Sequence, residues 1–253
     1  MARKTQLSLT TYTLNAVAML GWLRNVTFDA DTTLKSCKAI NARYQKQRET
    51  KRQLTFTGDH KRRAAAGDPC ETMGTITDLE IEGGSVLADC IGGSIDFTTV
   101  TDRADGGGDA LATLQACGTD VKGTLELLFD SAATASYVKD IASSGSISTT
   151  LLFTDGVGSV ELPIVIKGAG KTTGEGKNTV QTVMWEGDGT PTESGGTGTL
   201  FSLGLAGTAS FAFTYNDGIE AIAGTALITQ GSIKWSRDEI TSENYSCHVN
   251  VLS

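Results

Sequence analysis

Few residues of this chain have the types and spacing that catalysis requires. Nucleophilic catalysis by serine or cysteine normally needs a histidine or another base beside the nucleophile, and the 253 residues include only two histidines, His60 and His248. Cys247 directly precedes His248, but adjacent residues of a strand point to opposite faces. The sequence also lacks the G-x-S-x-G pattern of a nucleophile elbow. The sequence therefore predicts no active site, and we expect a protein that is not an enzyme and needs no cofactor.

One glycine-rich segment resembles the end of a phosphate-binding loop. Gly170, Lys171 and Thr172 fit the last positions of that motif, which also needs a glycine five residues before Gly170 and a helix after the threonine. Val165 stands at the glycine position, and further glycines follow where the helix should begin. We interpret residues 168–173 as a hairpin loop.

Metal binding finds little support in the sequence. Asp102, Asp105 and Asp109 are spaced oxygen ligands of the kind calcium uses, but the glutamate and fixed spacing of a calcium loop are missing. A solvated loop is the favoured interpretation. The five cysteines are scattered, without a C-x-x-C pair. Reduced thiols are therefore favoured over a structural zinc site, and we expect no bound metal.

Charge is distributed unevenly along the chain. Residues 1–66 contain 13 Lys and Arg against 4 Asp and Glu, a net of +9, whereas residues 67–253 contain 8 against 25, a net of −17. A basic segment can bind nucleic-acid phosphates, or it can contact the acidic body of a neighbouring copy. We favour the second interpretation because the acidic body repels nucleic acid, and a solvated loop remains the third. The candidate subunit-interface residues are Arg43, Lys46, Arg48, Lys51, Arg52, Lys61, Arg62 and Arg63.

The pattern of elements predicts a mostly β fold. Short alternating segments separated by Gly, Asp, Asn, Ser and Thr recur along the chain, with hairpin signals near residues 155–158 and 216–218. Ala-rich residues 131–142 predict a helix, and residues 109–117 predict a second, short one. No secretory signal or membrane span is visible, so we expect a soluble protein made in a cytoplasm, without a membrane partner.

We divide the chain into four parts. Residues 1–66 form basic N-terminal strands with a loop or arm, and residues 67–187 form the main β-sandwich with its helix. Residues 188–199, rich in Gly, Thr and Ser, form a linker or loop. Residues 200–253 supply closing strands or a small second β unit. The expected architecture is a β-sandwich or barrel with one short flanking helix.

The order of these elements resembles the tail tube proteins of long-tailed bacteriophages. The resemblance comprises a strand at 123–129, the helix at 132–142, the hairpin at 147–166 and a strand ending in Val183-Met184-Trp185-Glu186-Gly187. The last strands, around 224–229 and 232–235, are similar to the closing strands of those proteins. The basic segment between Asp31 and Arg52 corresponds to a long hairpin or loop between subunits. The resemblance covers about two-thirds of the chain and rests on pattern.

This resemblance implies a structural virion protein. Such a subunit self-assembles into stacked rings, sixfold or pseudo-sixfold, which form the conduit for DNA in the phage tail. It implies as partners further copies of the chain, other tail proteins and DNA passing through without specific binding, with assembly in the host cytoplasm. The alternative is a capsid decoration protein, or another β-sandwich virion or binding protein.

Overall fold

The computed structural model describes residues 9–20, 23–37, 46–61, 76–104, 111–129, 136–155, 159–175, 177–194, 210–236 and 242–253. The strands are β1 (Thr11–Leu14), β2 (Val17–Ala18), β3 (Leu23–Cys37), β4 (Lys46–Lys61), β5 (Ile76–Ile81), β6 (Gly84–Ser85), β7 (Cys90–Arg103), β8 (Leu114–Leu128), β9 (Ile147–Asp155), β10 (Ser159–Thr172), β11 (Val180–Gly187), β12 (Thr192–Ser194), β13 (Ser210–Asn216), β14 (Ala221–Ser236) and β15 (Ser242–Leu252), and the helix is α1 (Tyr137–Ser144). The prediction of a mostly β fold with one short helix is confirmed for these residues.

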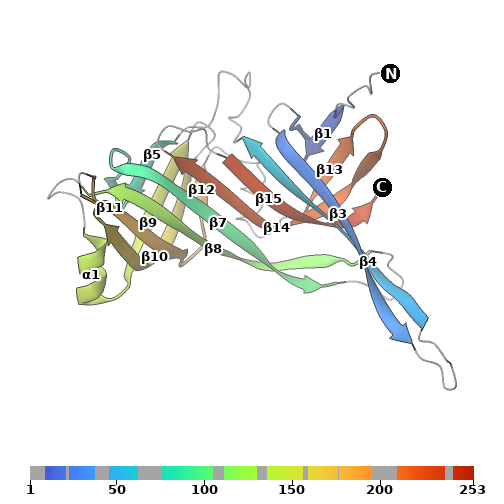
Figure 1. Cartoon of the computed structure of the whole chain (residues 1–253), viewed down its shortest axis with the longest axis horizontal. Helices are drawn as coiled ribbons and strands as arrows, with labels where there is room; N and C mark the ends of the chain where they lie inside the picture. The colour runs from blue at the N-terminus through green and yellow to red at the C-terminus, as the bar shows by residue number, and fades with distance from the viewer. Residues whose placement is uncertain are drawn as a thin grey trace.

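One antiparallel sheet runs through almost the whole molecule (Figure 1). One continuous path through it is β3-β4-β15-β14-β7-β8-β11-β10-β9-β5-β6. β14 is the branch point. Its first half pairs with β13, its second half pairs with β7, and β15 runs along its other edge. β13 in turn pairs with β1. The sheet is thereby split into two regions that share β14 and β15.

Aromatic side chains join the β13 layer to the β3–β4 layer. The ring of Phe28 on β3 lies 4.9 Å from that of Tyr215, and Phe56 on β4 lies 5.0 Å from Phe213, centroid to centroid. Phe56 and Phe213 are almost completely buried. Burial of such side chains removes large apolar areas from water, so this contact holds the two layers face to face.

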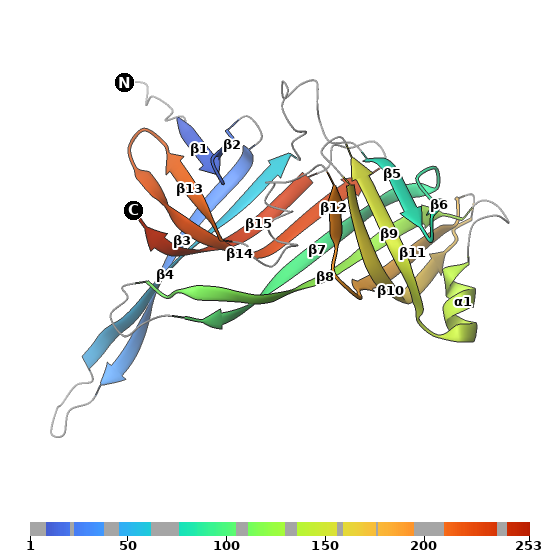
Figure 2. The same cartoon turned by 180° about the vertical axis from the view of Figure 1, so that it is seen from behind.

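The other region is a strongly curled sheet. Phe153 on β9 contacts Trp235 on β14 with ring centroids 5.1 Å apart, although β7, β8, β11 and β10 lie between these strands in the sheet. The concave interior is filled by fully buried aliphatic side chains such as Leu79, Ile95 and Leu125. The short helix α1 packs on β10 and β9 at the end of this region (Figure 2).

Both hairpin predictions are confirmed. β9 and β10 pair in register from Thr154 and Ser159 to Ile147 and Ile166. β13 and β14 are joined by a tight turn, in which Asp217 accepts hydrogen bonds from the backbone N–H groups of Ile219 and Glu220 at 2.9 and 2.8 Å. These bonds to the carboxylate lower the pKa of Asp217.

Two local predictions were wrong. The helix expected at 109–117 is absent from the part of that range that the structure describes, since β8 begins at Leu114 and pairs with β7. The partner strand and a side chain from β15 bind this backbone, and neither is visible in a local pattern. The loop expected at 168–173 is the end of β10, which pairs with β11. Gly168 lies beside Met184, whose terminal Cε atom is 2.7 Å from the position of an added Cβ.

The boundaries of the predicted helix also differ from the structure. It was expected over 131–142, whereas α1 spans Tyr137–Ser144, and residues 131–135 lie outside the described residues. Ser136 precedes the helix without a capping hydrogen bond from its side chain, and Gly145 ends it with φ of 84°. Burial of Tyr137 at the start of α1 therefore fixes this helix more than a local cap does.

Residues 210–253 share their sheet with the rest of the chain. β13 pairs with β1, β14 with β7, and β15 with β4. β12 pairs with β10 inside the segment expected to be a linker, and residues 195–209 lie outside the described residues. The four-part division of the chain stays a prediction.

Candidate assembly surface

Five of the candidate interface residues belong to β4, one strand of a long hairpin: Lys46, Arg48, Lys51, Arg52 and Lys61. β3 and β4 pair over nearly their whole length, from Leu23 opposite His60 to Cys37 opposite Lys46. The outer part of this hairpin projects from one end of the molecule, and α1 lies at the other end (Figures 1 and 2). Lys46, Arg48 and Lys51 belong to the projecting part of β4, and Arg52 lies at its base, where its carbonyl oxygen accepts a hydrogen bond from the Ala112 N–H. Arg43, Arg62 and Arg63 lie outside the described residues.

These candidates do not form one patch. β4 is 16 residues long, and at about 3.3 Å per residue its two ends are about 50 Å apart. Lys61 ends β4 beside Ser242, in the body of the sheet, far from Lys46 at the projecting end. The basic stretch of the sequence therefore contributes to two distant places on the molecule, and the role of its residues in subunit contacts stays a prediction.

A second surface was not predicted from the sequence. Six residues form a row across six neighbouring strands, each directly opposite the next in the ladder: Asn25, Asp59, Asn244, Ser232, Asp96 and Lys122. Two residues further along each strand lies a parallel row: Thr27, Thr57, Ser246, Gln230, Thr98 and Asp120. Directly opposite residues of a sheet point to the same side. We call the surface formed by these two rows the polar face.

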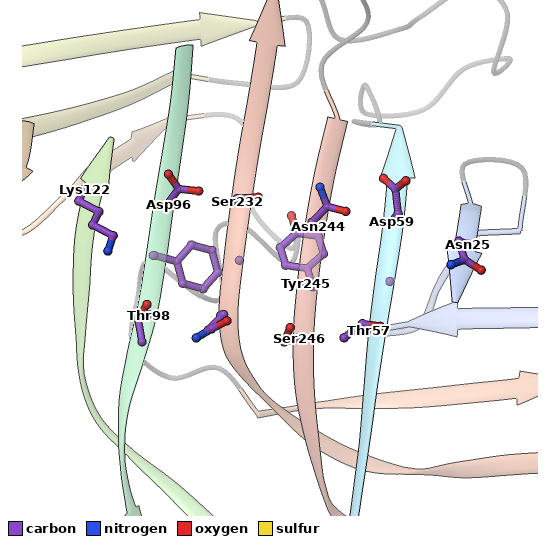
Figure 3. A pocket seen from close by; sticks show the side chains of 14 residues that line it. Asn25, Thr57, Asp59, Asp96, Thr98, Lys122, Ser232, Asn244, Tyr245 and Ser246 are labelled. Atoms are coloured by element: carbon purple, nitrogen blue, oxygen red, sulfur yellow. The ribbon is translucent and has the colours of Figure 1, made fainter. Parts of the chain in front are cut away.

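The polar face is hollowed. A depression of about 560 Å³ is lined by members of both rows and, between the rows, by Gly58, Phe97, Gly231 and Tyr245. Figure 3 shows the labelled side chains following one another from strand to strand. The intervening residues point to the interior. Phe97 and Tyr245 are buried and meet over Gly231, where an added Cβ would lie 2.3 Å from the Phe97 ring. The sheet thus separates an aromatic core from a hydrophilic concave surface.

The chemistry of the polar face is uniform. Its two rows consist of hydroxyl, amide and charged side chains, without an aromatic or aliphatic member. The acidic residues Asp59, Asp96 and Asp120 outnumber the single basic residue, Lys122. Lys122 stands opposite Asp96 on one side and Glu186 of β11 on the other, and Glu186 also forms an ion pair with Lys167. Such a surface offers water many hydrogen bonds and offers a polyanion little attraction.

The two histidines are both buried. His60 has no exposed surface, and its ring stacks on Tyr12 with centroids 5.6 Å apart and an interplanar angle of 7°. Its Nε2 lies 3.2 Å from the Tyr12 hydroxyl, while Nδ1 has no partner among the described residues. Burial lowers the pKa of His60 to about 4. His60 is therefore a neutral part of the core near neutral pH.

His248 binds the backbone of the segment that precedes β8. Its Nε2 donates a hydrogen bond to the carbonyl oxygen of Ala112 at 2.7 Å. Cys247 points to the other side of β15, as expected for adjacent strand residues, yet both are buried, because the segment before β8 covers one face and the core covers the other. Burial raises the pKa of the Cys247 thiol. The two side chains do not form a catalytic pair.

The aspartates considered as metal ligands form no metal site in the described residues. The part of the chain that the structure describes contains no group of three or more His, Cys, Asp or Glu side chains arranged to hold a metal ion. Asp102 accepts a weak hydrogen bond from the Cys117 thiol at 3.5 Å, and Asp105 and Asp109 lie outside the described residues. No helix in that part is long and apolar enough to cross a membrane.

The polar face could not have been found by inspecting single segments. Each of its residues occupies the hydrophilic position of an alternating strand, which the sequence does indicate. Which residue of one strand stands opposite which residue of the next depends on register, and register is fixed by pairing between segments up to two hundred residues apart.

Comparison with known proteins gives a weak likeness to a solved structure. No protein-family model matches the chain, and no curated protein matches it. Among solved structures, a chain from the "Virion of native gene transfer agent (GTA) particle" matches with a TM-score of 0.38 and 15% sequence identity, covering 46% of this chain and 95% of that chain. A likeness of that size assigns no family.

Proposed function

We propose that this chain is a structural virion protein, the tail tube subunit of a long-tailed bacteriophage, which self-assembles into stacked rings around a conduit for DNA. The observation that carries the proposal is the polar face, a hollowed hydrophilic surface across six strands. In the proposed ring this face of every copy lines the bore. The partners are further copies of the chain and other tail proteins, and the proposed role needs neither catalysis nor a cofactor.

The chemistry of the polar face suits a surface along which DNA slides. Proteins that hold nucleic acid use Lys and Arg against phosphates and aromatic side chains against bases. The two rows of the polar face contain one lysine, three aspartates and no aromatic residue, so they supply neither kind of attachment. Hydroxyl and amide groups keep the surface hydrated, and the excess of carboxylates repels phosphate at short range.

The projecting β3–β4 hairpin supports assembly into a larger structure. Among the described residues, Lys46–Lys51 of β4 pairs with β3 alone. An isolated two-stranded ribbon is only marginally stable by itself, so this outer part gains stability when it lies against a neighbouring copy. Its strand β4 carries the basic sequence Lys46–Arg52, whereas residues 67–253 have a net charge of −17. Opposite charge favours contact between the hairpin of one copy and the body of another.

Electron microscopy of the purified chain tests the proposal directly. We expect rings, and hollow tubes of uniform diameter at high protein concentration. The triple variant Arg48→Glu, Lys51→Glu and Arg52→Glu reverses the charge of the hairpin and should abolish tube growth while the monomer stays folded. The matched control reverses three lysines outside the hairpin, Lys139→Glu, Lys171→Glu and Lys177→Glu, and should still form tubes.

The outcomes separate the possible functions. Tubes that grow normally from the hairpin variant would remove the hairpin from the contact. Compact monomers at all salt and protein concentrations would contradict the tube itself. A protein that stays monomeric but coats preformed phage capsids would instead be a capsid decoration protein.

A further inference from the structure

β3 has a long backbone edge that no described strand covers. β3 pairs with β4 alone, so for 15 residues the N–H and C=O groups on its other side have no strand partner in the described part of the chain. Natural sheets usually protect such an edge with proline, with lysine or with a short strand. Residues 23–32 of β3 contain neither proline nor lysine.

A second open edge lies at the far side of the polar face. β11 pairs with β8 only from Lys122 to Leu128, and β8 continues in the other direction to Leu114. Residues 115–121 of β8 therefore have β7 on one side and no described strand on the other. Where β11 leaves β8, a hollow of about 470 Å³ is lined by residues 119–122, by Glu186, Gly187 and Gly189, and by Thr98 of β7 on the face of the sheet. An incoming strand has room beside this part of β8.

The two edges have opposite strand directions. Six strands, β3-β4-β15-β14-β7-β8, are joined by five consecutive antiparallel pairings, so β3 and β8 run antiparallel to each other. In a ring every copy has the same orientation relative to the axis. When β3 of one copy meets β8 of the next, the ladder therefore continues in antiparallel order, and the contact is of the heterologous kind that closes a ring.

The open parts also lie at the same level of the sheet. Thr27 of β3 and Asp120 of β8 end the same row of the polar face. Beyond that row, the same face continues through residues 29 and 31 of β3 and through residues 118 and 116 of β8. Both strands run there toward the end of the molecule from which the hairpin projects. Gly118 has nothing within 4 Å of an added Cβ, so the side-chain face there is also open.

We propose that residues 26–32 of β3 in one copy pair antiparallel with residues 115–121 of β8 in the next copy, with Thr27 opposite Asp120. This inference rests on the proposed ring and names the surface that closes it. The row of Thr27, Thr57, Ser246, Gln230, Thr98 and Asp120 then continues without interruption from one copy to the next. The open part of β8 and seven residues of the β3 edge gain a strand partner.

Disulfide trapping tests this pairing. In a Cys117→Ser background, which removes the exposed thiol of β8, the variant Thr27→Cys with Asp120→Cys places two exposed positions opposite each other across the proposed contact. Mild oxidation should give a ladder of covalent oligomers that ends at the closed ring. The matched control, Thr27→Cys with Glu220→Cys, moves the second thiol to the exposed β13–β14 turn and should give no ladder.

Electron microscopy of the same samples separates this inference from the proposed function. Tubes or rings without a disulfide ladder would overturn the β3–β8 pairing and leave the tube intact. A ladder with closed rings that never stack would support the pairing and contradict the tube. Monomers without a ladder would overturn both, and a ladder of equal yield in the control would show random collision and overturn the pairing.

Discussion

The indole ring of Trp185 lies directly over Gly123 on the neighbouring strand. A Cβ added at residue 123 would be 2.3 Å from Cζ2 of Trp185 and 2.1 Å from the carbonyl oxygen of Ser94. Trp235 lies over Gly93 in the same way, with Cζ2 2.5 Å from an added Cβ. Both tryptophans are buried. The two glycines provide the space that lets large rings fill the curled part of the sheet.

We predict that Gly123→Ala is strongly destabilising. The added methyl group meets backbone and a buried ring, neither of which can move freely, and overpacking of this kind costs about 1–3 kcal/mol or more. The free energy of unfolding in urea measures the loss. Gly118→Ala, in the same strand but with open space beside it, is the control and should stay within about 0.5 kcal/mol of the wild type. Equal effects at both positions would contradict the role of Trp185.

Buried His60 predicts a stability that falls as the pH falls. Its pKa is lowered to about 4 in the folded chain and is near 6.5 when the chain is unfolded, so the unfolded state binds the proton more readily between these values. The contribution of neutral His60 to the free energy of unfolding is fully present above about pH 6.5. It is lost as the pH falls toward 4, by about 3 kcal/mol in total.

Urea unfolding at a series of pH values measures this effect. The variant His60→Phe retains an aromatic ring against Tyr12 and removes the titrating group, so its stability should change less between pH 6.5 and 4.5. A His60→Phe variant with the same pH profile as the wild type would assign the loss to other groups.

We predict that removing the Asn250 side chain loosens the start of β8 without unfolding the rest of the sheet. The side-chain Nδ2 of Asn250 donates to the carbonyl oxygen of Leu114 at 2.9 Å, and its Oδ1 accepts from the Leu114 N–H at 3.0 Å. Asn250→Ala leaves two backbone groups of Leu114 without these partners, which costs about 1–3 kcal/mol. Hydrogen exchange at Leu114 should accelerate, while exchange at the buried residues of β9 and β10 stays slow. Unchanged exchange at Leu114 would show that Asn250 does not hold the start of β8.

We predict that positive charge added to the polar face makes DNA bind to the bore. The triple variant Thr57→Lys, Ser246→Lys and Thr98→Lys changes three members of one row of the polar face. Tubes assembled from it should bind DNA with an affinity that falls as the salt concentration rises. The slope of log affinity against log salt concentration should steepen by about one for each lysine that meets a phosphate. Filter binding over a salt series measures it. Lysines at the exposed positions Ser143, Ser144 and Thr172 are the control, and equal binding by both variants would contradict a bore lined by the polar face.

The sequence by itself determined the class of fold and much of its local structure. Alternation of polar and apolar residues predicts β9, β10, β13 and β14 because a strand buried on one face needs that period. Asn216-Asp217-Gly218 predicts its turn because Gly218 adopts a positive φ and Asp217 binds the backbone of the turn. The uneven charge of residues 1–66 and 67–253 was also readable directly.

The tertiary structure alone decided which residues share a surface. The polar face joins Asn25 to Asn244 and Asp59 to Lys122 through ladder pairings between distant segments, and a shift by one residue in any strand would send its side chains to the core. Residues 111–117 lack a helix where they are described because β7 and Asn250 bind that backbone from afar. Lys46 and Lys61, basic residues of one short stretch of sequence, lie far apart because the extended strand β4 separates its ends by about 50 Å.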